Sequence, residues 1–286
     1  LPPETVEGVK AADACLFAAV GNTAKAVILP LRQSLGLYAN MRPAKTYPGV
    51  DALKQNVDLM IVRENTEDLY KMVGHREKDW GINMRIITRE ASDRIAHHAF
   101  RYAEKNHRTK VTAVHKANVL AKIYGLWIEK AEVVAKEYPD IELEFTIADA
   151  TTMWLVRRPE WFQVIVAPNL FGDIISDLAA ATVGGLGFAP GGNINPDRKA
   201  GVSMFEPIHG SAPKHAGLNK ANPIGTILAG KLMLEHLGEE RAAGLVEQAT
   251  EDVLAAGKIR TYDIGGTASC SDMGDAISER LLQLKP

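Results

Sequence analysis

Short apolar runs alternate along the chain with longer segments of helical period. Four runs are typical of buried strands, namely Asp58–Arg63, Lys110–Val114, Ile141–Ala148 and Val164–Ala167. Two longer segments between these runs have apolar residues at helical spacing. A strand followed by a helix, several times over, predicts an α/β fold with a largely parallel sheet.

The first helical segment is Ser92–Asn106, in which Ser92 is the expected N-cap. Its apolar face is formed by Ile95, Ala96, Ala99, Phe100 and Ala103. The second segment is Leu120–Tyr138, which Pro139 and Asp140 end. Both segments are long enough to cover a sheet.

Two stretches depart from this rhythm. Gly74–Thr88 contains alternating Ile82, Met84 and Ile86, which is the pattern of an exposed β-ribbon. Gly184–Gly192 is dense in glycine and is expected to be a loop or a hinge. No repeat and no low-complexity tract is visible.

The overall composition is that of an ordinary globular protein. The chain has 286 residues, 46% of them hydrophobic and 24% charged, with a net charge of −2. This balance predicts no attraction to nucleic acid or to an anionic membrane. Two cysteines, no apolar run of about 20 residues and no signal-peptide pattern favour the cytoplasm.

The segment Asn169–Asp177 contains two carboxylates four residues apart, Asp173 and Asp177. On a helix they share one face, where they repel each other unless a cation lies between them. Oxygen ligands favour Mg²⁺ or Mn²⁺. By itself the spacing fits a solvated polar face better. Asp149, at the end of a predicted strand, is a candidate third ligand.

Three arginines lie near the ends of predicted elements, Arg32, Arg42 and Arg63. Such a set suits a di- or tricarboxylate, because a guanidinium matches a carboxylate in shape and charge. Arg63, beside Glu64, also fits a structural ion pair. Tyr70 fits a packing residue as well as an acid, and Lys116 fits a surface charge as well as a base.

Several motifs together carry a resemblance that none carries alone. They are LRQSLGLYANMRPAK, IVRENTEDLY, HKANVL, NLFGDIISD, GGLGFAP, FEPIHGSAP and ANP, in this order. With them the chain resembles the β-decarboxylating dehydrogenases, which act on isopropylmalate, isocitrate, homoisocitrate and tartrate or D-malate. The resemblance covers essentially the whole chain. It implies two open α/β domains with a cleft between them and a cofactor site that is not of the Rossmann type.

The resemblance also implies residue roles. Arg32, Arg42 and Arg63 would bind the carboxylates of a malate-type acid, and Asn118 would lie near substrate and nicotinamide. Asp173 and Asp177 would bind the metal together with Asp149 from a neighbouring subunit. Lys116 of that neighbour would act with Asp149 on the substrate hydroxyl, and Tyr70 would protonate the enolate. The site would therefore need a homodimer, or a tetramer of such dimers.

The implied domains are a cofactor-binding domain of residues 1–37 and 185–286 and a dimerisation and metal domain of residues 38–184. An intersubunit arm would lie near residues 70–88. Members of the family usually open with a strand and a Gly-Asp-Gly-Ile-Gly-Pro-type loop, which this sequence lacks. The resemblance therefore predicts that the N-terminal part of the cofactor domain is missing here.

The cofactor is expected to bind through a loop and its surroundings. The implied residues are Glu206, His209, Gly210, Ser211, Ala212, Pro213, Lys214, His215, Asn222 and Tyr262. Lys214 and His215 stand where NAD-using relatives carry Asp-Ile and NADP-using relatives carry Lys-Tyr. Tyr262 also follows the NADP pattern, whereas Gly266 replaces an arginine of that pattern. The sequence thus favours NADP over NAD.

The substrate pocket is expected to have an apolar wall. Ala26, Ile28 and Leu29 lie one helical turn before Arg32, and Val119 would come from the neighbour. Such a wall suits the isopropyl group of 3-isopropylmalate, an intermediate of leucine biosynthesis, better than the charged group of isocitrate. The stretch RENTEDLY is instead more typical of isocitrate and homoisocitrate enzymes. Archaeal-type isopropylmalate enzymes mix the two patterns as this chain does.

Two other classes of protein remain open at this point. A noncatalytic regulatory subunit of an isocitrate dehydrogenase should have lost site residues, but all those implied above are present. A Mg²⁺-dependent phosphoryl-transfer enzyme should carry a loop such as GxxxxGK[ST], and none occurs. A decarboxylating dehydrogenase is therefore the favoured prediction.

Overall fold

The computed structural model describes residues 2–21, 26–196 and 201–284. Within these residues, one eight-stranded sheet has the strand order β1-β10-β9-β2-β3-β8-β6-β7, and β4 and β5 form a separate ribbon. The strands are β1 (Ala14–Leu16), β2 (Ala39–Lys45), β3 (Asp58–Glu64), β4 (Gly74–Arg76), β5 (Gly81–Asn83), β6 (Lys110–His115), β7 (Glu142–Ile147), β8 (Val164–Ala167), β9 (Pro190–Ile194) and β10 (Ser203–Pro207). The predicted α/β class is confirmed.

The four predicted strands lie side by side and form one continuous parallel part of this sheet. β3 pairs with β8, β8 with β6, and β6 with β7, all in parallel. Their carboxyl ends therefore meet at one edge, where open α/β sheets bind ligands. β2 and β9 run antiparallel to their neighbours and continue the sheet towards β10 and β1.

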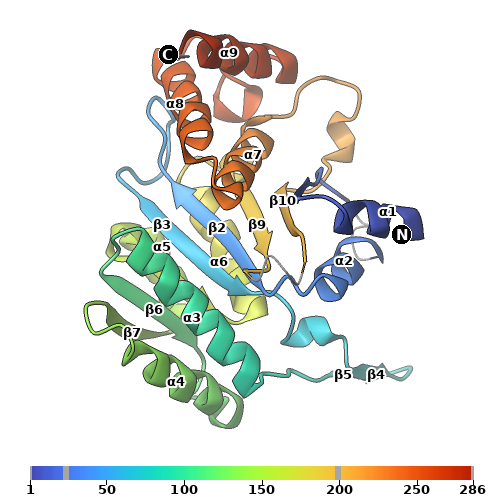
Figure 1. Cartoon of the computed structure of the whole chain (residues 1–286), viewed down its shortest axis with the longest axis vertical. Coiled ribbons are helices and arrows are strands. Elements are labelled where there is room, and N and C mark those ends of the chain that lie inside the picture. The colour runs from blue at the N-terminus through green and yellow to red at the C-terminus, as the bar shows by residue number, and fades with distance from the viewer. Residues whose placement is uncertain (1, 22–25, 197–200, 285–286) are drawn as a thin grey trace.

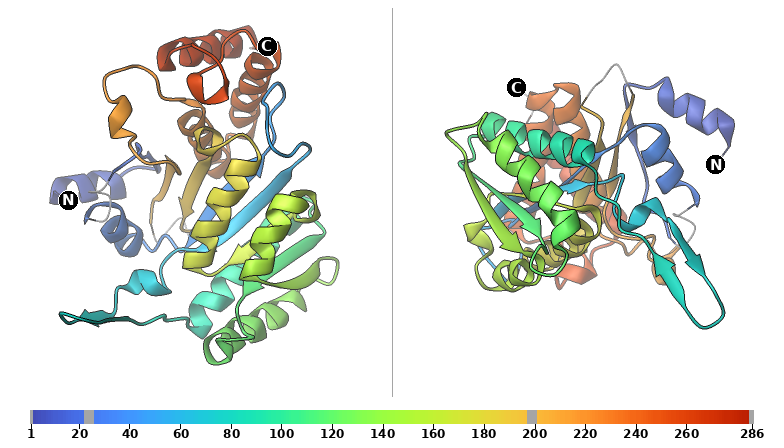
Figure 2. Two further views of the ribbon diagram at one scale, coloured as in Figure 1. Left: turned by 180° about the vertical axis from the view of Figure 1, so that it is seen from behind. Right: turned by 90° about the horizontal axis from the view of Figure 1, so that it is seen from below.

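Helices cover both faces of the parallel part, as Figures 1 and 2 show from opposite sides. On one face α3 (Arg89–Lys105) and α4 (Ala121–Ala135) pack against the side chains of Met60 and Val62. On the other face α5 (Ala148–Arg157) and α6 (Asn169–Thr182) pack against Leu59 and Ile61. Since alternate residues of a strand point to opposite faces, one apolar run in β3 fills two cores.

The remaining helices lie towards the other end of the sheet. α7 (Ile224–Leu237), α8 (Glu240–Ala256) and α9 (Cys270–Gln283) form a core with Tyr47 and Val50, which follow β2. α1 (Pro3–Lys10) and α2 (Ile28–Ser34) pack around Met204 of β10. Figure 1 shows α7 to α9 at the top and the N-terminal helices beside β10.

The predicted N-cap of the first helix was wrong. α3 begins at Arg89 with Thr88 as its N-cap, and the Thr88 hydroxyl accepts from Ala91 N at 3.1 Å. Ser92 is buried inside the helix, where its hydroxyl donates to Thr88 O at 2.7 Å. A serine can bond the carbonyl four residues before it, so its presence alone does not mark a helix start.

The prediction of a loop over Gly184–Gly192 was also wrong in part. A 3-10 turn, Leu186–Phe188, is followed at Pro190 by strand β9. A Cβ added to Gly192 would lie 3.1 Å from Cε1 of the Phe205 side chain on the neighbouring strand, so the glycine leaves room for this ring. The glycines of this stretch therefore reflect tight packing within the sheet as well as a turn.

The predicted ribbon is present. β4 and β5 pair through Gly74–Asn83, His75–Ile82 and Arg76–Gly81, and the ribbon projects from the body of the molecule in Figures 1 and 2. Ile82 and Met84 are exposed on it. Ile86 lies at its base, where its carbonyl accepts from Asp68 N at 2.8 Å.

The main sheet contains strands from both predicted domains. β2 pairs with β3 on one side and with β9 on the other, so the two predicted regions share a strand-to-strand contact. The division into two domains stays a prediction. In the described residues no helix is long and apolar enough to cross a membrane.

Candidate active site

Strand register places a set of polar side chains on one face of the sheet. Asn40 of β2 lies opposite Arg63 of β3 on one side and Asn193 of β9 on the other. Glu206 of β10 lies opposite Gly191, two residues before Asn193, and Arg42 is two residues after Asn40. Directly paired residues and residues two apart share a face.

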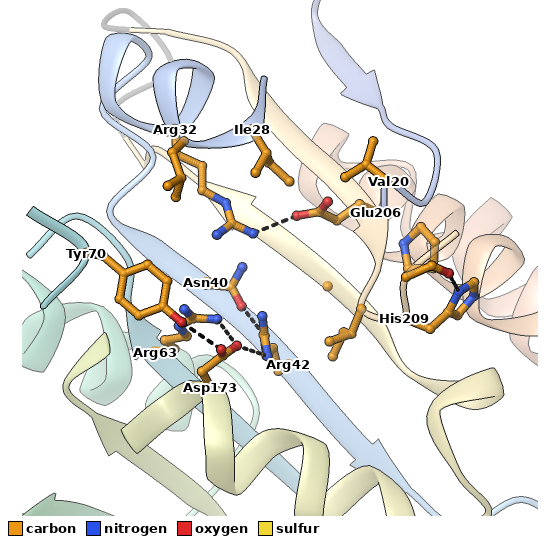
Figure 3. A pocket seen from close by; sticks show the side chains of 15 residues that line it. Val20, Ile28, Arg32, Asn40, Arg42, Arg63, Tyr70, Asp173, Glu206 and His209 are labelled. Atoms are coloured by element: carbon orange, nitrogen blue, oxygen red, sulfur yellow. Dashed lines mark hydrogen bonds and ion pairs between the residues drawn. The ribbon is translucent and has the colours of Figure 1, made fainter. Parts of the chain in front are cut away.

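A pocket of about 260 Å³ opens on this face near the strand ends (Figure 3). The predicted substrate residues Arg32, Arg42 and Arg63 all line it, together with Tyr70 and Asp173. The other lining residues are Val20, Ile28, Leu29, Asn40, Gly191, Glu206, Pro207, Ile208, His209 and Gly210. Three arginine side chains, the carboxylate of Asp173 on α6 and an apolar wall thus surround the same pocket.

Arg63 is held rigidly at the floor of the pocket. Its Nε and Nη2 donate to Asn169 Oδ1 at 2.9 and 2.7 Å, and its Nη1 donates to Asp173. Gly172 lets α6 come this close, because a Cβ there would lie 2.7 Å from Arg63 Cβ. Burial lowers the pKa of Arg63 to about 10, which still leaves it charged at neutral pH.

Asp173 is the partner of three pocket residues. Arg42 Nη1 lies 3.0 Å from its Oδ1, Arg63 donates to the same oxygen, and the Tyr70 hydroxyl donates to Oδ2 at 2.8 Å. Burial alone would raise the pKa of Asp173, but Arg63 and Arg42 outweigh it and hold the pKa below its ordinary value. The carboxylate is therefore ionised at neutral pH.

Tyr70 lies beside this carboxylate with its ring against Arg63, whose Cζ is 5.0 Å from the ring centroid. Burial raises the pKa of the Tyr70 hydroxyl above its ordinary value, and the charge of Asp173 adds to the rise against the opposing effect of Arg63. The hydroxyl is thus protonated and points into the pocket, as an acid must be.

Asp173 and Asp177 fit a divalent cation. They lie one helical turn apart on α6, and Arg42 Nη1 is 3.5 Å from Asp177 Oδ1. Burial raises the pKa of Asp177, the nearby Asp173 adds to the rise, and Arg42 opposes it. A bound cation would offset the burial and the repulsion that disfavour the ionised form of Asp177. The donor atoms are all oxygens, which Mg²⁺ and Mn²⁺ prefer.

Asp149 does not join these carboxylates within one chain. Among the described residues no group of three or more metal-ligating side chains comes together. Asp149 lies in the first turn of α5 with 71% of its side chain exposed, and its Oδ1 is 2.5 Å from Lys116 Nζ. The hydrogen bond from Lys116 lowers the pKa of Asp149.

The Lys116–Asp149 pair follows β6 and β7, at the same edge of the sheet as the pocket. Asn118 and Val119 are beside it and exposed, Val119 to 69%. None of these four residues lines the pocket of its own chain. The prediction that they complete the site of a neighbouring subunit stays a prediction.

Arg32 closes the opposite side of the pocket. Its Nη2 donates to Glu206 Oε1 at 2.9 Å, and both side chains are buried (Figure 3). Within the described residues its Nε is buried without a hydrogen-bond partner. Ile28 and Leu29 lie in the same helix, α2, and form an apolar wall with Val20 and Ile208. Ala26, just before α2, is exposed and does not line the pocket.

The predicted cofactor residues fall into two groups. Glu206, His209 and Gly210 line the pocket, whereas Ser211, Ala212, Pro213, Lys214 and His215 continue away from it in an exposed loop and a 3-10 turn. His209 Nε2 is buried and, in the part of the chain that the structure describes, has no hydrogen-bond partner. An unsatisfied ring nitrogen at the pocket fits a polar group of a nucleotide.

The second group lies around Tyr262. Its hydroxyl is 3.3 Å from His215 Nε2, and Lys220 Nζ is 4.4 Å from its ring centroid. Asn222 donates to Asp263, the residue after Tyr262, at 2.9 Å. The structure thus brings together residues that sequence reasoning assigned to one ligand, and adds Lys220 to the cations nearby.

Sequence reasoning missed several residues that support the site. Asn169 holds Arg63, and Ser176 accepts from Arg42 Nη1 at 2.7 Å. Asn40 and Asn193 connect Arg42 with Glu206. Asn169 and Ser176 belong to the same short segment as the two aspartates, which was a usable signal. The pairing of Asn40 with Asn193 instead depends on a register between distant strands.

Comparison with known proteins gives a consistent result. A family model described as isocitrate/isopropylmalate dehydrogenase matches residues 1–277. A 3-isopropylmalate dehydrogenase of Methanothermobacter thermautotrophicus is 48% identical over 98% of this chain and 84% of the relative. A 3-isopropylmalate/3-methylmalate dehydrogenase of Methanocaldococcus jannaschii is 47% identical over the same shares.

Similar folds occur among solved structures. An isocitrate dehydrogenase from Methylococcus capsulatus superimposes with a TM-score of 0.93 at 43% identity, over 98% of this chain and 85% of the other. Homoisocitrate dehydrogenases and both regulatory and catalytic subunits of NAD-dependent isocitrate dehydrogenases are also among the relatives.

Proposed function

Because the chain belongs to the isocitrate/isopropylmalate dehydrogenase family, and is therefore a decarboxylating dehydrogenase, we propose that it acts on 3-isopropylmalate. The reaction is the NAD(P)-linked oxidation and decarboxylation of this malate-type 2-hydroxy acid with Mg²⁺ or Mn²⁺. It serves leucine biosynthesis, and isocitrate is the second candidate substrate.

One observation carries the proposal: Arg32, Arg42 and Arg63 converge on one pocket beside Asp173 and Tyr70. Guanidinium groups from three separate elements suit a small acid with two carboxylates. A phosphoryl-transfer site would need a phosphate-binding loop instead, and the sequence contains no such motif. The retained site residues also disfavour a noncatalytic regulatory subunit.

The choice of 3-isopropylmalate rests on the wall of the pocket. Ile28, Leu29, Val20 and Ile208 supply apolar surface next to Arg32. An isopropyl group gains by leaving water there, whereas a charged carboxylate would lose its hydration without a partner. Val119 of a neighbouring subunit is expected to extend this wall. The stretch RENTEDLY, Arg63–Tyr70, is the feature that keeps isocitrate as second candidate.

The residues of this chain have distinct tasks in the reaction. The three arginines bind and orient the two carboxylates, with Asn118 alongside. Lys116, paired with Asp149, takes the proton of the substrate hydroxyl. A bound nicotinamide would supply the acceptor for the hydride of the same carbon. After the β-keto acid loses CO₂, the Tyr70 hydroxyl delivers a proton to carbon. Asp173, Asp177 and Asp149 would hold the cation, which would supply Lewis-acid chemistry when bound.

The preferred cofactor is NADP in our proposal. Lys214 and Lys220 lie near His215 and Tyr262, and cations at this place suit a 2′-phosphate, whereas an acid would bind the ribose hydroxyls of NAD. His209 and Glu206 would contact the cofactor nearer the nicotinamide end. A homodimer in the cytoplasm completes the proposal, since Lys116 and Asp149 need a neighbouring site.

A substrate panel tests the proposed function. The full chain is assayed for NAD(P)H absorbance with Mn²⁺, both cofactors, and 3-isopropylmalate, isocitrate, homoisocitrate, D-malate and tartrate in turn. The highest kcat/KM is expected with 3-isopropylmalate and NADP. A higher kcat/KM with isocitrate would replace the proposed substrate, and no activity with any acid would refute the proposal.

A further inference from the structure

A chain of buried hydrogen bonds runs beneath the pocket from Arg42 to Glu206. Arg42 Nε donates to Asn40 Oδ1 at 2.6 Å, and Asn40 Nδ2 donates to Asn193 Oδ1 at 2.6 Å. Asn193 Nδ2 then donates to Glu206 Oε1 at 2.7 Å, and the same oxygen accepts from Arg32. Figure 3 shows its two ends, Asn40 with Arg42 and Glu206 with Arg32. We call Asn40 and Asn193 the asparagine relay.

The end groups fix the direction of this relay. A guanidinium can only donate, and an ionised carboxylate can only accept. Each amide must therefore turn its oxygen towards Arg42 and its NH₂ group towards Glu206. All bonds point the same way, so each polarises the next, and the relay has one stable arrangement.

Burial makes this arrangement costly to disturb. Asn40 is 1% and Asn193 is 0% exposed, so a lost partner is not replaced by solvent. Asn65 Nδ2 adds a second donor to Asn193 Oδ1 at 3.0 Å, and Asn193 Nδ2 also reaches Met204 O at 3.3 Å. The relay is thus anchored to three neighbouring strands and the segment after β3.

The two arginines at its ends come from different elements. Arg32 lies in α2 and Arg42 in β2, and their like charges oppose a close approach. To bind two carboxylates of one small molecule, the two arginines must lie at a fixed distance from each other. A mobile pair of arginine side chains would have to be ordered when the ligand binds.

We propose that Asn40 and Asn193 are positioning residues, whose relay holds Arg32 and Arg42 at a fixed separation and so sets the affinity for the dicarboxylate substrate. The inference rests on the proposed function, because it takes the two arginines as carboxylate ligands. It adds that part of the substrate affinity depends on Asn193, which does not line the pocket, acting through Asn40 and Glu206.

Asn193→Asp tests this with a readout that a general structural role would not produce. The new carboxylate still accepts from Asn40, but it faces Glu206 at the position of the former NH₂ group. Two carboxylates this close cannot both be ionised without strong repulsion, so the pair takes up a proton as the pH falls. The protonated group can donate to Glu206 and restores the relay. Among the residues that the structure describes, the charged and titratable groups that interact with Glu206 are Arg32, Arg42 and Cys15.

The measurement is substrate binding by calorimetry, with Mn²⁺ and without cofactor, at about pH 8 and about pH 6. We expect the variant to bind about tenfold more weakly than wild type at the higher pH, a loss of about 1.4 kcal/mol, and to approach wild type at the lower pH. Asn193→Ala should be weak at both values, because it has no proton to regain. In steady-state assays KM should change more than kcat.

Controls separate the relay from stability and from the proposed function. Thr250→Val removes a buried hydroxyl of α8 far from the pocket and should bind as wild type does. Asn40→Ala should weaken substrate binding as Asn193→Ala does. If Asn193→Asp does not fold, Asn40→Ala is measured in its place. Wild-type affinity of folded relay variants at both pH values would overturn the relay alone. A wild type that binds no acid of the panel would overturn the proposed function.

Discussion

Asp173 shows how a single residue can organise the candidate site. It accepts from Arg42, Arg63 and Tyr70, and it is also a predicted metal ligand. The same carboxylate therefore connects the residues proposed to bind the substrate with the residue proposed to protonate the enolate. A change in any one partner alters the charge around the others.

The first prediction concerns Tyr70. Tyr70→Phe removes the hydroxyl that donates to Asp173 and keeps the ring against Arg63. We expect overall turnover to fall by about 10²- to 10⁴-fold, the usual contribution of a general acid. Reduction of the keto-acid intermediate by NAD(P)H, which needs no proton transfer to carbon, should fall less. Stopped-flow and steady-state rates measure the two steps.

Equal slowing of both steps would argue against the protonation role. Tyr138→Phe is the matched control, because Tyr138 stacks on Phe100 between helices outside the pocket. That variant should retain wild-type turnover.

At this scale the sequence predicted which polar residues share the pocket. Arg32, Arg42, Arg63, Tyr70 and Asp173 do lie together. Each fits a plain structural role when taken alone, and only the motifs together, through the family resemblance, implied a common site. The asparagine relay could not be predicted in this way, since it exists only because the β2–β9 register places Asn40 opposite Asn193.

Among the helices, α9 has the most complete N-terminal cap in the described part of the chain. Ser269 Oγ accepts from Asp272 N at 3.1 Å, and Asp272 Oδ2 accepts from Ser269 N at 2.9 Å. The helix buries Met273 and Ile277 in the core with α7 and α8. The cap therefore fixes the position at which these apolar residues enter that core.

The second prediction follows from this cap. Ser269→Ala should lower the free energy of unfolding at neutral pH by about 1 kcal/mol, as the loss of an N-cap hydroxyl usually does. Urea unfolding followed by circular dichroism measures it. A midpoint equal to that of wild type would contradict a stabilising cap.

The cap should also show a pH dependence. Hydrogen bonds from Ser269 lower the pKa of Asp272 in the folded protein. The stability that Asp272 adds is therefore present above the ordinary carboxyl pKa and is lost as the pH falls through the lowered value. The difference between Asp272→Asn and wild type should shrink over that range. Asp275→Asn, an exposed change in the next turn, serves as the control substitution outside the capping box.

The success of prediction also varied between elements. Strands rich in β-branched residues, such as Asp58–Glu64 and Val164–Ala167, were recognised because they are buried on both faces. The glycine-containing strand β9 was not, because its pairing with β2 and β10 outweighs its low intrinsic preference for a strand. The start of α3 was misplaced because Ser92 and Thr88 are equally suitable caps by type.

On the scale of the whole molecule, the predicted substrate, metal and proton-transfer residues form two separate clusters. Asp173 and the arginines enclose the pocket, whereas Lys116 and Asp149 are paired with each other and open to solvent. The exposed ribbon residues Ile82 and Met84 are further apolar surface outside the core. A homodimer with shared sites, as proposed, would give all of these residues partners.

The third prediction is that complementary variants restore activity in a mixed dimer. Lys116→Ala and Asp173→Asn should each be inactive as homodimers, and Lys116→Ala should still bind Mn²⁺. If the clusters meet across a two-fold interface, a heterodimer of the two variants has one intact site, and its activity is expected to be about half that of wild type. Co-expression with two affinity tags isolates this species for assay.

A matched heterodimer serves as control. Tyr70 and Asp173 contact each other within one chain, so Tyr70→Phe combined with Asp173→Asn should leave both sites defective. An inactive Lys116→Ala/Asp173→Asn heterodimer would refute the shared site.

The pairing of β1 with β10 bears on how the protein is made. β1 (Ala14–Leu16) pairs in parallel with Ser203–Phe205, about 190 residues later in the chain. At ribosomal speeds of about 5–20 residues per second, the nascent strand waits roughly 10–40 s for this partner. Meanwhile β2 can pair with β3 as soon as that strand emerges. Co-translational folding should therefore begin at β2 and β3, and β1, although it is synthesised before them, should join the sheet late.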